Sequence, residues 1–329
     1  MRRPRRRSRA LAPALAPIDL SRVHTVPLGR RRSLVLSAAL GRPVRGRQTV
    51  RSFLDGLPDI LAARDLRLAA TRIAEAVRRG RAVVLGMGAH PIKVGLGPLI
   101  VDLIDRGRLA AIAMNGACLV HDFELAWNGR TSEDVGPGLD RGTFGMARET
   151  GEFLNAACRD GVASGLGLGR SVGEAIVRDR LPFRRLSILA AAARAGIPAT
   201  VHVAIGTDII HMHPSADGAA IGEGSMRDFR LLAGVIARLG GGVYVNLGSA
   251  VVLPEVFVKA LNLARNVGHP VRGITTINMD FNRHYRPAVN VVARPTATSG
   301  VGIHLTGHHE IMFPLLLAAV EDALARRRR

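Results

Sequence analysis

The chain has 329 residues, of which 47% are hydrophobic and 4% aromatic, and its formal net charge is +20. This length allows one large domain or two small ones. A membrane-spanning class is excluded, because no apolar run reaches the roughly 18–20 uncharged residues that a bilayer requires. A disulfide framework is also excluded, because the only cysteines are Cys118 and Cys158, and we expect a protein of the reducing cytoplasm.

The positive charge is concentrated at the two ends of the chain. Six of the first nine residues are Arg, and the last four residues are all Arg. We expect a basic, disordered or irregular segment over residues 1–50, a single α/β domain over 51–325 and a basic tail over 326–329. The Arg-rich ends allow non-specific contact with nucleic acid. The low aromatic content offers few stacking platforms for bases, so nucleic-acid binding is not the expected function.

From residue 58 onward the hydrophobic pattern becomes regular. Helical spacing of apolar residues predicts helices over residues 59–79, 96–106, 121–127, 143–160, 173–195, 225–239, 254–266 and 309–325. Short apolar runs predict strands over 81–88, 109–116, 198–208, 241–249 and 273–280, with one or two more in 285–307. Apolar strands that alternate with helices are typical of a mostly parallel sheet covered on both faces. The predicted fold class is therefore α/β and Rossmann-like.

Nearly every predicted strand ends with a small residue beside a polar one. The endings are Gly86-Met87-Gly88, Asn115-Gly116, Gly206-Thr207-Asp208, Gly248-Ser249, Asn278-Met279-Asp280 and Thr306-Gly307-His308. In open α/β sheets, ligands bind in the crevice at the carboxyl ends of the strands. Small residues let a ligand approach the backbone there, and helix N-termini offer N–H groups to phosphates. The endings therefore predict a nucleotide-sized site.

Histidines gather in two places. His211 and His213 follow a predicted strand at alternate positions, a spacing that lets two side chains share a metal ion, with Glu310 as a further ligand. Hydrogen bonding in a polar cleft explains the same two histidines without a metal. His308 and His309 precede Glu310 at the start of the last predicted helix, where a histidine can act as a general base near neutral pH.

Three stretches, residues 83–126, 245–266 and 298–319, occur in the same order as similar stretches of the deoxyhypusine synthase family, which this chain resembles over about residues 80–320. Residues 83–126 resemble the part of that family where a strand, a turn and a helix lead to a T-A-G-G-x-E-E-D strand end. Residues 245–266 resemble its L-G-G-G-V segment with the downstream N-L-x-R-N, and residues 298–319 resemble its S-G and F-P-L-L-V-A segments. The family has an NAD-binding α/β fold and is usually tetrameric. It transfers an aminobutyl group from spermidine to a protein lysine by NAD-dependent oxidation through an imine.

The resemblance implies NAD as the cofactor, an amine as the substrate and a homo-oligomer, with a tetramer as the family's usual state. Residues that it places at the cofactor are Gly88, Ala89, His90, Asn115, Gly116, His121, Asp122, Asp217, Gly248, Ser249, Thr298, Ser299 and Gly300. Asp208 and Glu223 are the acids that we expect to hold the substrate. For Asp217, which precedes Gly218, a carboxylate that binds ribose hydroxyls is a second interpretation.

The sequence departs from the family at its catalytic residues. The family's catalytic lysine lies in a W-G-K stretch, and residues 301–310, VGIHLTGHHE, contain no lysine. Without it the covalent imine route of the family is not available. We therefore expect the four clustered histidines to carry the acid–base work: His211, His213, His308 and His309.

Three hypotheses for function follow. The first is an NAD-dependent transferase or oxidoreductase that acts on a small amine or amino-acid-like substrate and does not make deoxyhypusine. The second is a metal-dependent hydrolase or lyase that uses the two histidine clusters. The third is a non-catalytic nucleotide-binding subunit.

Overall fold

The computed structural model describes residues 16–326, so most of the two Arg-rich ends, residues 1–15 and 327–329, lies outside the described residues. The chain divides into two compact units between Ala39 and Leu40. In the first unit the described elements are three short 3-10 helices, η1 (Leu20–Arg22), η2 (Leu28–Arg30) and η3 (Ser37–Ala39). The sheet and the whole candidate site belong to the second unit.

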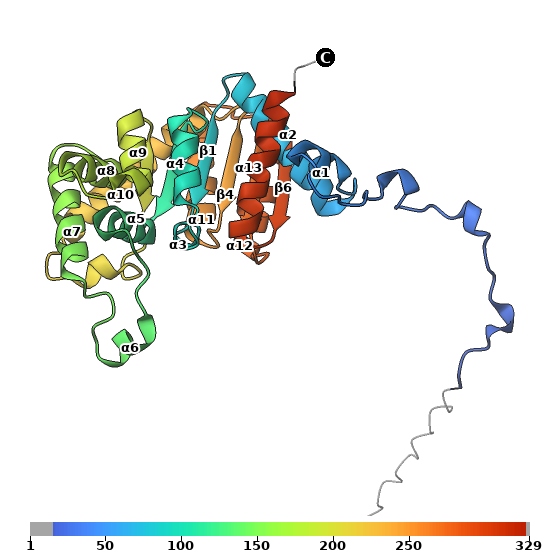
Figure 1. Ribbon diagram of the computed structural model, residues 1–329, viewed down its shortest axis with the longest axis horizontal. Helices are drawn as coiled ribbons and strands as arrows, with labels where there is room; N and C mark the ends of the chain where they lie inside the picture. Colours follow the sequence, from blue (N-terminus) through green and yellow to red (C-terminus); the bar gives the residue numbers. More distant parts are fainter. Residues whose placement is uncertain (1–15, 327–329) are drawn as a thin grey trace, which may run out of the picture. The chain divides into compact units, whose positions relative to one another are not determined.

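The second unit is built on a parallel sheet (Figure 1). Its strands are β1 (Val83–Met87), β2 (Ala111–Asn115), β3 (Ala199–His202), β4 (Val243–Leu247), β5 (Ile274–Asp280) and β6 (Gly300–Thr306). Within residues 16–326 the six strands lie in the order β3-β2-β1-β4-β5-β6, and every pairing is parallel. The predicted Rossmann-like α/β class is confirmed. Strand order reverses between β1 and β4, which is where ligands bind in folds of this class.

Helices cover both faces of the sheet. Their bounds are α1 (Val50–Gly56), α2 (Leu61–Arg78), α3 (His90–Lys93), α4 (Gly97–Asp105), α5 (Gly116–Asn128), α6 (Val135–Asp140), α7 (Arg148–Ala163), α8 (Leu168–Arg178), α9 (Ile188–Ala195), α10 (Gly218–Ala237), α11 (Val252–Asn266), α12 (Tyr285–Pro287) and α13 (His309–Ala325), with the 3-10 helices η4 (Arg184–Leu186) and η5 (Ile209–Met212) and the π-helix η6 (Ala288–Ala293). Helices α2, α4, α5 and α13 share one apolar cluster with the sheet, and α10, α11 and η6 share the other. Figure 1 shows α4 and α13 on the side of the sheet toward the viewer. None of the helices between residues 16 and 326 combines the length and hydrophobicity that a bilayer crossing requires.

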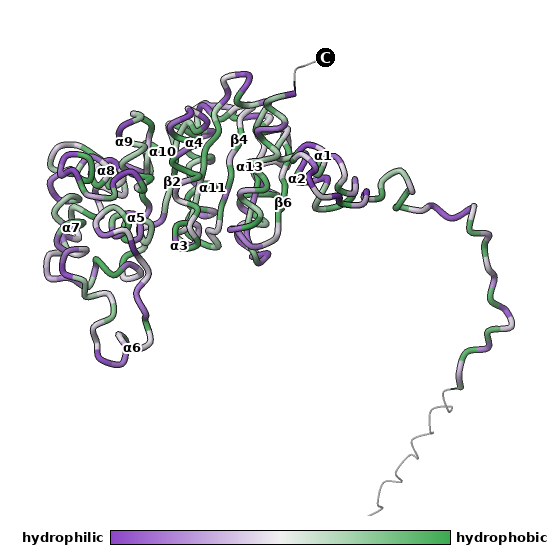
Figure 2. Tube along the Cα trace, viewed as in Figure 1, coloured by the Kyte–Doolittle hydropathy of each residue, from purple (hydrophilic) through white to green (hydrophobic). Residues whose placement is uncertain are grey.

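The sheet is buried on both faces, which explains why its strands read as continuous apolar runs. Strands β1, β4 and β5 are buried at every position. In Figure 2 the central strands are mostly green or white, and purple is concentrated on helices and loops. Beneath α11, the ring of Tyr244 stacks on Phe257 with centroids 3.8 Å apart. A Cβ at Gly86 would lie 2.1 Å from the Tyr244 hydroxyl, so β1 needs glycine opposite this ring.

One prediction for an individual element is wrong. The single helix predicted over residues 173–195 is two helices, α8 and α9, because Arg180 takes a left-handed conformation (φ 53°) and Pro182 follows it. Of the one or two strands predicted in residues 285–307, one is present as β6, and the residues before it form α12 and η6. Helix η6 packs closely on β6, because a Cβ at Gly302 would lie 2.3 Å from the Val292 carbonyl oxygen.

One buried carboxylate joins three elements of this fold. Asp228 of α10 is 1% exposed, and its Oδ2 accepts hydrogen bonds from the N–H groups of Gly169 in α8 (3.0 Å) and Val201 in β3 (2.8 Å). Burial raises the pKa of Asp228 to about 7, although these hydrogen bonds act to lower it. The native state therefore keeps a proton on Asp228 at pH values where the unfolded chain has lost it.

This linkage gives a pH-dependent prediction for Asp228→Asn. Between the ordinary aspartate pKa of about 3.9 and the raised native value, the native state binds one proton more than the unfolded state, so this group's stabilisation is complete at low pH and is lost as the pH rises toward about 7. Asparagine does not titrate. We expect the unfolding free energy of the wild type, relative to Asp228→Asn, to fall from about pH 4.5 to 7.5 and then to level off. Urea unfolding across that range measures it, and a difference that does not change with pH contradicts the raised pKa.

Candidate functional site

The carboxyl ends of β1 and β4 form the centre of the site. The N–H of Gly88 donates to the Leu247 carbonyl (3.1 Å), and the N–H of Gly248 donates to the Met279 carbonyl (3.0 Å). A Cβ at Gly88 would lie 2.4 Å from the Gly248 carbonyl oxygen, and Gly248 has a positive φ of 64°. A side chain at Gly88 would require a backbone shift, and one at Gly248 would strain the backbone and crowd His309. The chain therefore keeps bare backbone where the strand order reverses.

Four aromatic side chains gather beside these glycines. His90, at the start of α3, and His309, at the start of α13, have their Nδ1 atoms 2.8 Å apart. The ring of Phe281 lies 5.5 Å from His90 and 5.8 Å from His309, and exposed His308 stacks on it at 6.3 Å. His309 fills the space next to Gly248, where a Cβ would lie 2.9 Å from its Cε1. Three histidines that the sequence assigned to a site thus lie together.

Beneath this cluster, two asparagines fix the turn that follows β4. Asn246 and Asn278 are paired in the register of β4 and β5, and the Asn246 Nδ2 donates to the Asn278 Oδ1 (2.7 Å) and the Ser249 carbonyl (2.8 Å). The Ser249 hydroxyl oxygen accepts from the N–H of Leu253 in α11 (3.1 Å). Ser249, predicted to touch the cofactor, therefore caps α11 with its side chain.

On the β2 side, Asn115 and Gly116 end the strand and begin α5. The carboxylate of Asp208 packs directly on Gly116, because a Cβ there would lie 2.0 Å from Asp208 Oδ2. Asp208 is 6% exposed, and within the described chain its Oδ2 has no hydrogen-bond partner. Burial raises the pKa of Asp208 to about 6. The fold thus keeps a carboxylate whose burial is energetically unfavourable next to the start of α5.

Asp208 lines a cavity of about 200 Å³ that carries several charged groups. Lys93 comes from α3, Glu124 from α5 and Glu133 from the loop before α6. The Glu133 carboxylate accepts from the N–H of Gly145 (2.8 Å). Three carboxylates against one ammonium make the cavity negative, which suits a cationic ligand.

A hydrogen-bond chain fixes the wall of this cavity. The Thr131 hydroxyl donates to Glu124 Oε2 (2.5 Å) and lies 2.6 Å from the His121 Nδ1, so this nitrogen must donate to it. Burial, and next the charge of Lys93, lowers the pKa of His121 to about 4. His121 is therefore neutral at physiological pH and adds no positive charge to the cavity.

The predicted metal site is not formed. His211 Nδ1 accepts from the N–H of Gly206 (3.1 Å), whereas the His213 Nε2 lies 2.9 Å from the Gly145 carbonyl. Across residues 16–326 there is no group of three or more His, Cys, Asp and Glu side chains that could hold a metal ion. The described structure thus does not bring together His211, His213 and Glu310, the alternative metal ligands. The physical reason is that β3 ends at His202, so the two histidines are not alternate residues of a strand.

Three of the predicted acids stabilise helices. Asp122 is fully buried and accepts from the N–H groups of Ile188 (2.7 Å) and Leu189 (3.2 Å) at the start of α9. Asp217 accepts from two N–H groups in the first turn of α10. Exposed Glu223 lies 2.7 Å from Arg227 on the same helix. These carboxylates already make structural contacts. To bind a cofactor, as predicted for Asp122 and Asp217, or a substrate, as predicted for Glu223, each would have to break or share those contacts.

The structure places Thr298, Ser299 and Gly300, the predicted nicotinamide contacts, away from the glycine turns after β1 and β4. Gly300 begins β6 and pairs with Ile274, which begins β5. These residues therefore lie at the amino edge of the sheet, opposite Gly88 and Gly248. The Ser299 hydroxyl accepts from the Gly273 N–H (3.2 Å), which also belongs to that edge.

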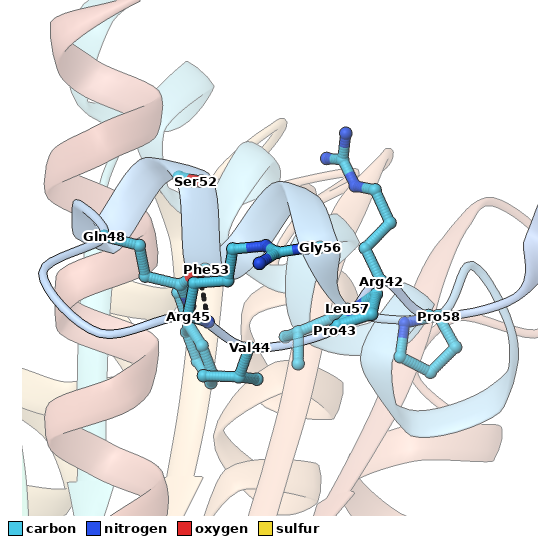
Figure 3. A pocket seen from close by; sticks show the side chains of 11 residues that line it. Arg42, Pro43, Val44, Arg45, Gln48, Ser52, Phe53, Gly56, Leu57 and Pro58 are labelled. Carbon is cyan, nitrogen blue, oxygen red and sulfur yellow. Dashed lines mark hydrogen bonds between the residues drawn. The ribbon is translucent and has the colours of Figure 1, made fainter.

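Two further cavities lie outside this cluster. One, of about 490 Å³, is lined by His202 of β3 and by Met226, Glu255 and Lys259 of α10 and α11. The other, of about 560 Å³, lies between residues 41–45 and α1 (Figure 3). Helix α1 binds the carboxyl end of α13 through Arg51 and Asp322 (2.6 Å), far along that helix from His309.

Three residues of the acidic cavity and one beside the histidines were missed from the sequence. Glu124 could have been found, because it lies three residues after His121 on the same helix and shares its side. Asp280 was visible as a strand ending but received no role. Lys93 and Glu133 come from a short helix and a loop, where the sequence gives no spacing signal.

No protein-family model and no curated protein sequence matches the chain. Among solved structures, it is similar to a putative LOR/SDH protein from Methanococcus maripaludis S2, with 15% identity over 92% of this chain and 76% of that chain and a TM-score of 0.51. It is also similar to AgrE in a complex with ornithine and NAD+, with 17% identity over 80% of this chain and a TM-score of 0.51. A putative deoxyhypusine synthase from Entamoeba histolytica matches at 12% identity over 87% of this chain and 98% of that chain, with a TM-score of 0.48.

The chain spans about a third of the length of AgrE, since it covers 34% of that protein. At these identities a structural likeness shows a common fold and nothing finer. The matches to the LOR/SDH protein and to AgrE show that this chain shares their α/β fold.

Proposed function

We propose that the chain is an NAD-dependent enzyme that acts on a small amine or amino-acid-like substrate by redox or transfer chemistry. The observation that carries the proposal is the bare backbone at Gly88 and Gly248, where β1 meets β4 and a Cβ at either position would collide with its neighbours. A dinucleotide needs this kind of close backbone approach at the carboxyl edge of the sheet. Residues suited to hold it are Gly88, Ala89, His90 and Gly248.

The acidic cavity supports the amine half of the proposal. Glu124, Glu133 and Asp208 can bind ammonium groups, and Lys93 can bind a carboxylate. An amino acid with a second amine in its side chain has both kinds of group. AgrE, which shares the fold, forms a complex with ornithine and NAD+, and ornithine is such an amino acid.

When bound, a nicotinamide accepts a hydride from a carbon that bears nitrogen or oxygen. The residues of this chain would hold the substrate for that step. Glu124 is kept in place by Thr131 and Thr150, so its carboxylate is oriented before an ammonium group arrives. Such preorganisation reduces the entropic cost of binding.

Calorimetry on the purified protein tests both the proposed binding of NAD and the proposed binding of an amine substrate. We expect NAD to bind the wild type, and ornithine, as the probe, to bind the NAD complex. Glu124→Gln removes a cavity charge and keeps the side-chain shape, so we expect ornithine affinity to fall about 10-fold with NAD affinity unchanged. The matched control is Glu174→Gln, which removes an exposed carboxylate paired with Arg170 and should change neither affinity.

Each outcome favours one hypothesis. Absence of NAD binding contradicts the proposed function. Binding of NAD to every subunit, without turnover of ornithine or of other primary amines, favours the non-catalytic nucleotide-binding subunit.

A further inference from the structure

The close contact between His90 and His309 limits where their protons can be. Their Nδ1 atoms are 2.8 Å apart, so one nitrogen donates a hydrogen and the other accepts it. His309 Nε2 lies 3.3 Å from the Met279 carbonyl, which can only accept. His309 therefore carries a hydrogen on Nε2. The remaining question is whether it also carries one on Nδ1.

The surroundings of His309 favour the neutral ring. It is 1% exposed, and it lies in the first turn of α13, where the helix dipole disfavours a positive charge. Burial lowers the pKa of His309, although Asp280, with Oδ1 3.9 Å from Nε2, acts in the opposite direction. A neutral His309 with its hydrogen on Nε2 has a lone pair on Nδ1. His90 must then donate from its own Nδ1.

In the neutral His90 ring this assignment leaves the other nitrogen, Nε2, unprotonated. Within residues 16–326, the His90 Nε2 makes no hydrogen bond to the protein, and the side chain is half-buried next to Gly88 and Ala89. His309 packs against Gly248 on the other side of the pair. The lone pair of His90 Nε2 is thus held beside the backbone of Gly88 and Gly248, where the strand order reverses.

Charged and titratable groups near the pair come from three elements. Asp280 ends β5, and exposed His308 and Glu310 flank His309 at the start of α13. Lys93 lies on α3, one turn after His90. Asp280 is the only one of these that is buried, and it lies on the far side of His309 from His90. The charge of a protonated His90 can therefore be balanced through the His309 ring.

We propose that His90 is the proton acceptor of this site, through Nε2, and that His309 is a positioning residue that holds His90 in the Nδ1–H tautomer. The uptake of a substrate proton by His90 Nε2 rests on the proposed function, whereas the assignment of the Nδ1–H tautomer does not. Oxidation of a carbon that bears an ammonium or hydroxyl group, by a nicotinamide when one is bound, would also release one proton from that group. Nε2 takes this proton and the ring becomes an imidazolium. His309 stays neutral and keeps accepting from Nδ1.

The tautomer can be measured without any substrate. In protein labelled with 15N-histidine, two-bond 1H–15N correlations at about neutral pH distinguish protonated from unprotonated ring nitrogens. The His90 signals are identified by their absence in His90→Gln. We expect a protonated Nδ1 and an unprotonated Nε2 in the wild type. A proton on Nε2 with Nδ1 unprotonated overturns the proposal.

Two variants separate positioning from packing. His309→Phe keeps an aromatic ring but removes the acceptor, so we expect His90 to change to the Nε2–H tautomer or to exchange between the two. His308→Gln alters the exposed neighbour and should leave the His90 tautomer unchanged. An unchanged tautomer in folded His309→Phe contradicts the positioning role.

Addition of NAD to the labelled wild type gives a separate readout. We expect the His90 Nε2 resonance to shift on binding, with His269, which follows α11, unaffected. If NAD binds in calorimetry but leaves the His90 resonances unmoved, His90 is not at the site and the proposal fails. If NAD does not bind at all, the proposed function fails while the tautomer result still stands.

Discussion

Gly88→Ala is expected to abolish measurable NAD binding. The added Cβ would lie 2.4 Å from the Gly248 carbonyl oxygen, and both atoms belong to backbone held in the β1–β4 pair. The strand ends must separate to make room, which moves the two glycine turns that the dinucleotide approaches. A crowding substitution of this kind destabilises a protein by about 1–3 kcal/mol. We expect NAD affinity to fall at least about 100-fold in protein that still folds, because contacts to two backbone segments are lost together.

Gly234→Ala is the matched control for this substitution. Gly234 lies in the interior of α10, and a Cβ there would have no atom within 4 Å. Alanine in a helix interior is more favourable than glycine by about 0.5–1 kcal/mol, so this variant should be slightly more stable than the wild type and bind NAD equally. Calorimetry and urea unfolding on the same samples separate the two effects. Wild-type NAD affinity in Gly88→Ala would show that the dinucleotide binds elsewhere.

Asp122→Ala is expected to be the most destabilising substitution of a predicted site residue. Its carboxylate accepts from the N–H groups of Ile188 and Leu189 and from the Ser187 hydroxyl (2.5 Å), all at the start of α9. Alanine leaves these three donors buried without partners. Each unpaired buried donor costs about 1–3 kcal/mol, and we expect a total loss of about 3–5 kcal/mol in the free energy of unfolding.

The same variant also tests the cofactor role that the family resemblance implied for Asp122. Its carboxylate is fully buried against α9, so we expect the folded fraction of Asp122→Ala to bind NAD as the wild type does. Asp102→Ala is the comparison, because it removes an exposed carboxylate paired with Arg106 (3.3 Å) and should change stability by less than about 1 kcal/mol. A loss of NAD binding in Asp122→Ala at full stability would restore the cofactor role.

The fold and the strand endings could be predicted from the sequence because both depend on local patterns. Buried parallel strands give apolar runs, and Gly88 and Gly248 stood out as small residues at their ends. The edge of the sheet at which a residue lies depends instead on where each strand begins. For this reason the sequence could not indicate the edge at which Thr298–Gly300 lie: they stand where β6 begins, although the family's S-G segment suggested a place beside the nicotinamide.

The two sides of α5 show a signal that was present but not used. His121 and Glu124 are three residues apart and line the acidic cavity, whereas Asp122 is turned by about 100° from His121 and faces α9. Helical periodicity alone separates them once the helix is known to begin at Gly116. By contrast, the contact between His90 and His309 joins residues from two distant helices, and no spacing in the sequence could indicate it.

The pairing of β1 with β4 has a consequence for the order in which the chain folds. Val83 pairs with Val243, a far larger separation along the sequence than in the other strand pairs of the described sheet. Contacts between distant segments must overcome a larger loop-closure entropy and tend to form slowly. Strands β1–β3 and β4–β6 can each assemble from nearer neighbours, so the seam between them is expected to close last. The candidate site lies on this seam, and it therefore exists only once the two halves of the sheet have joined.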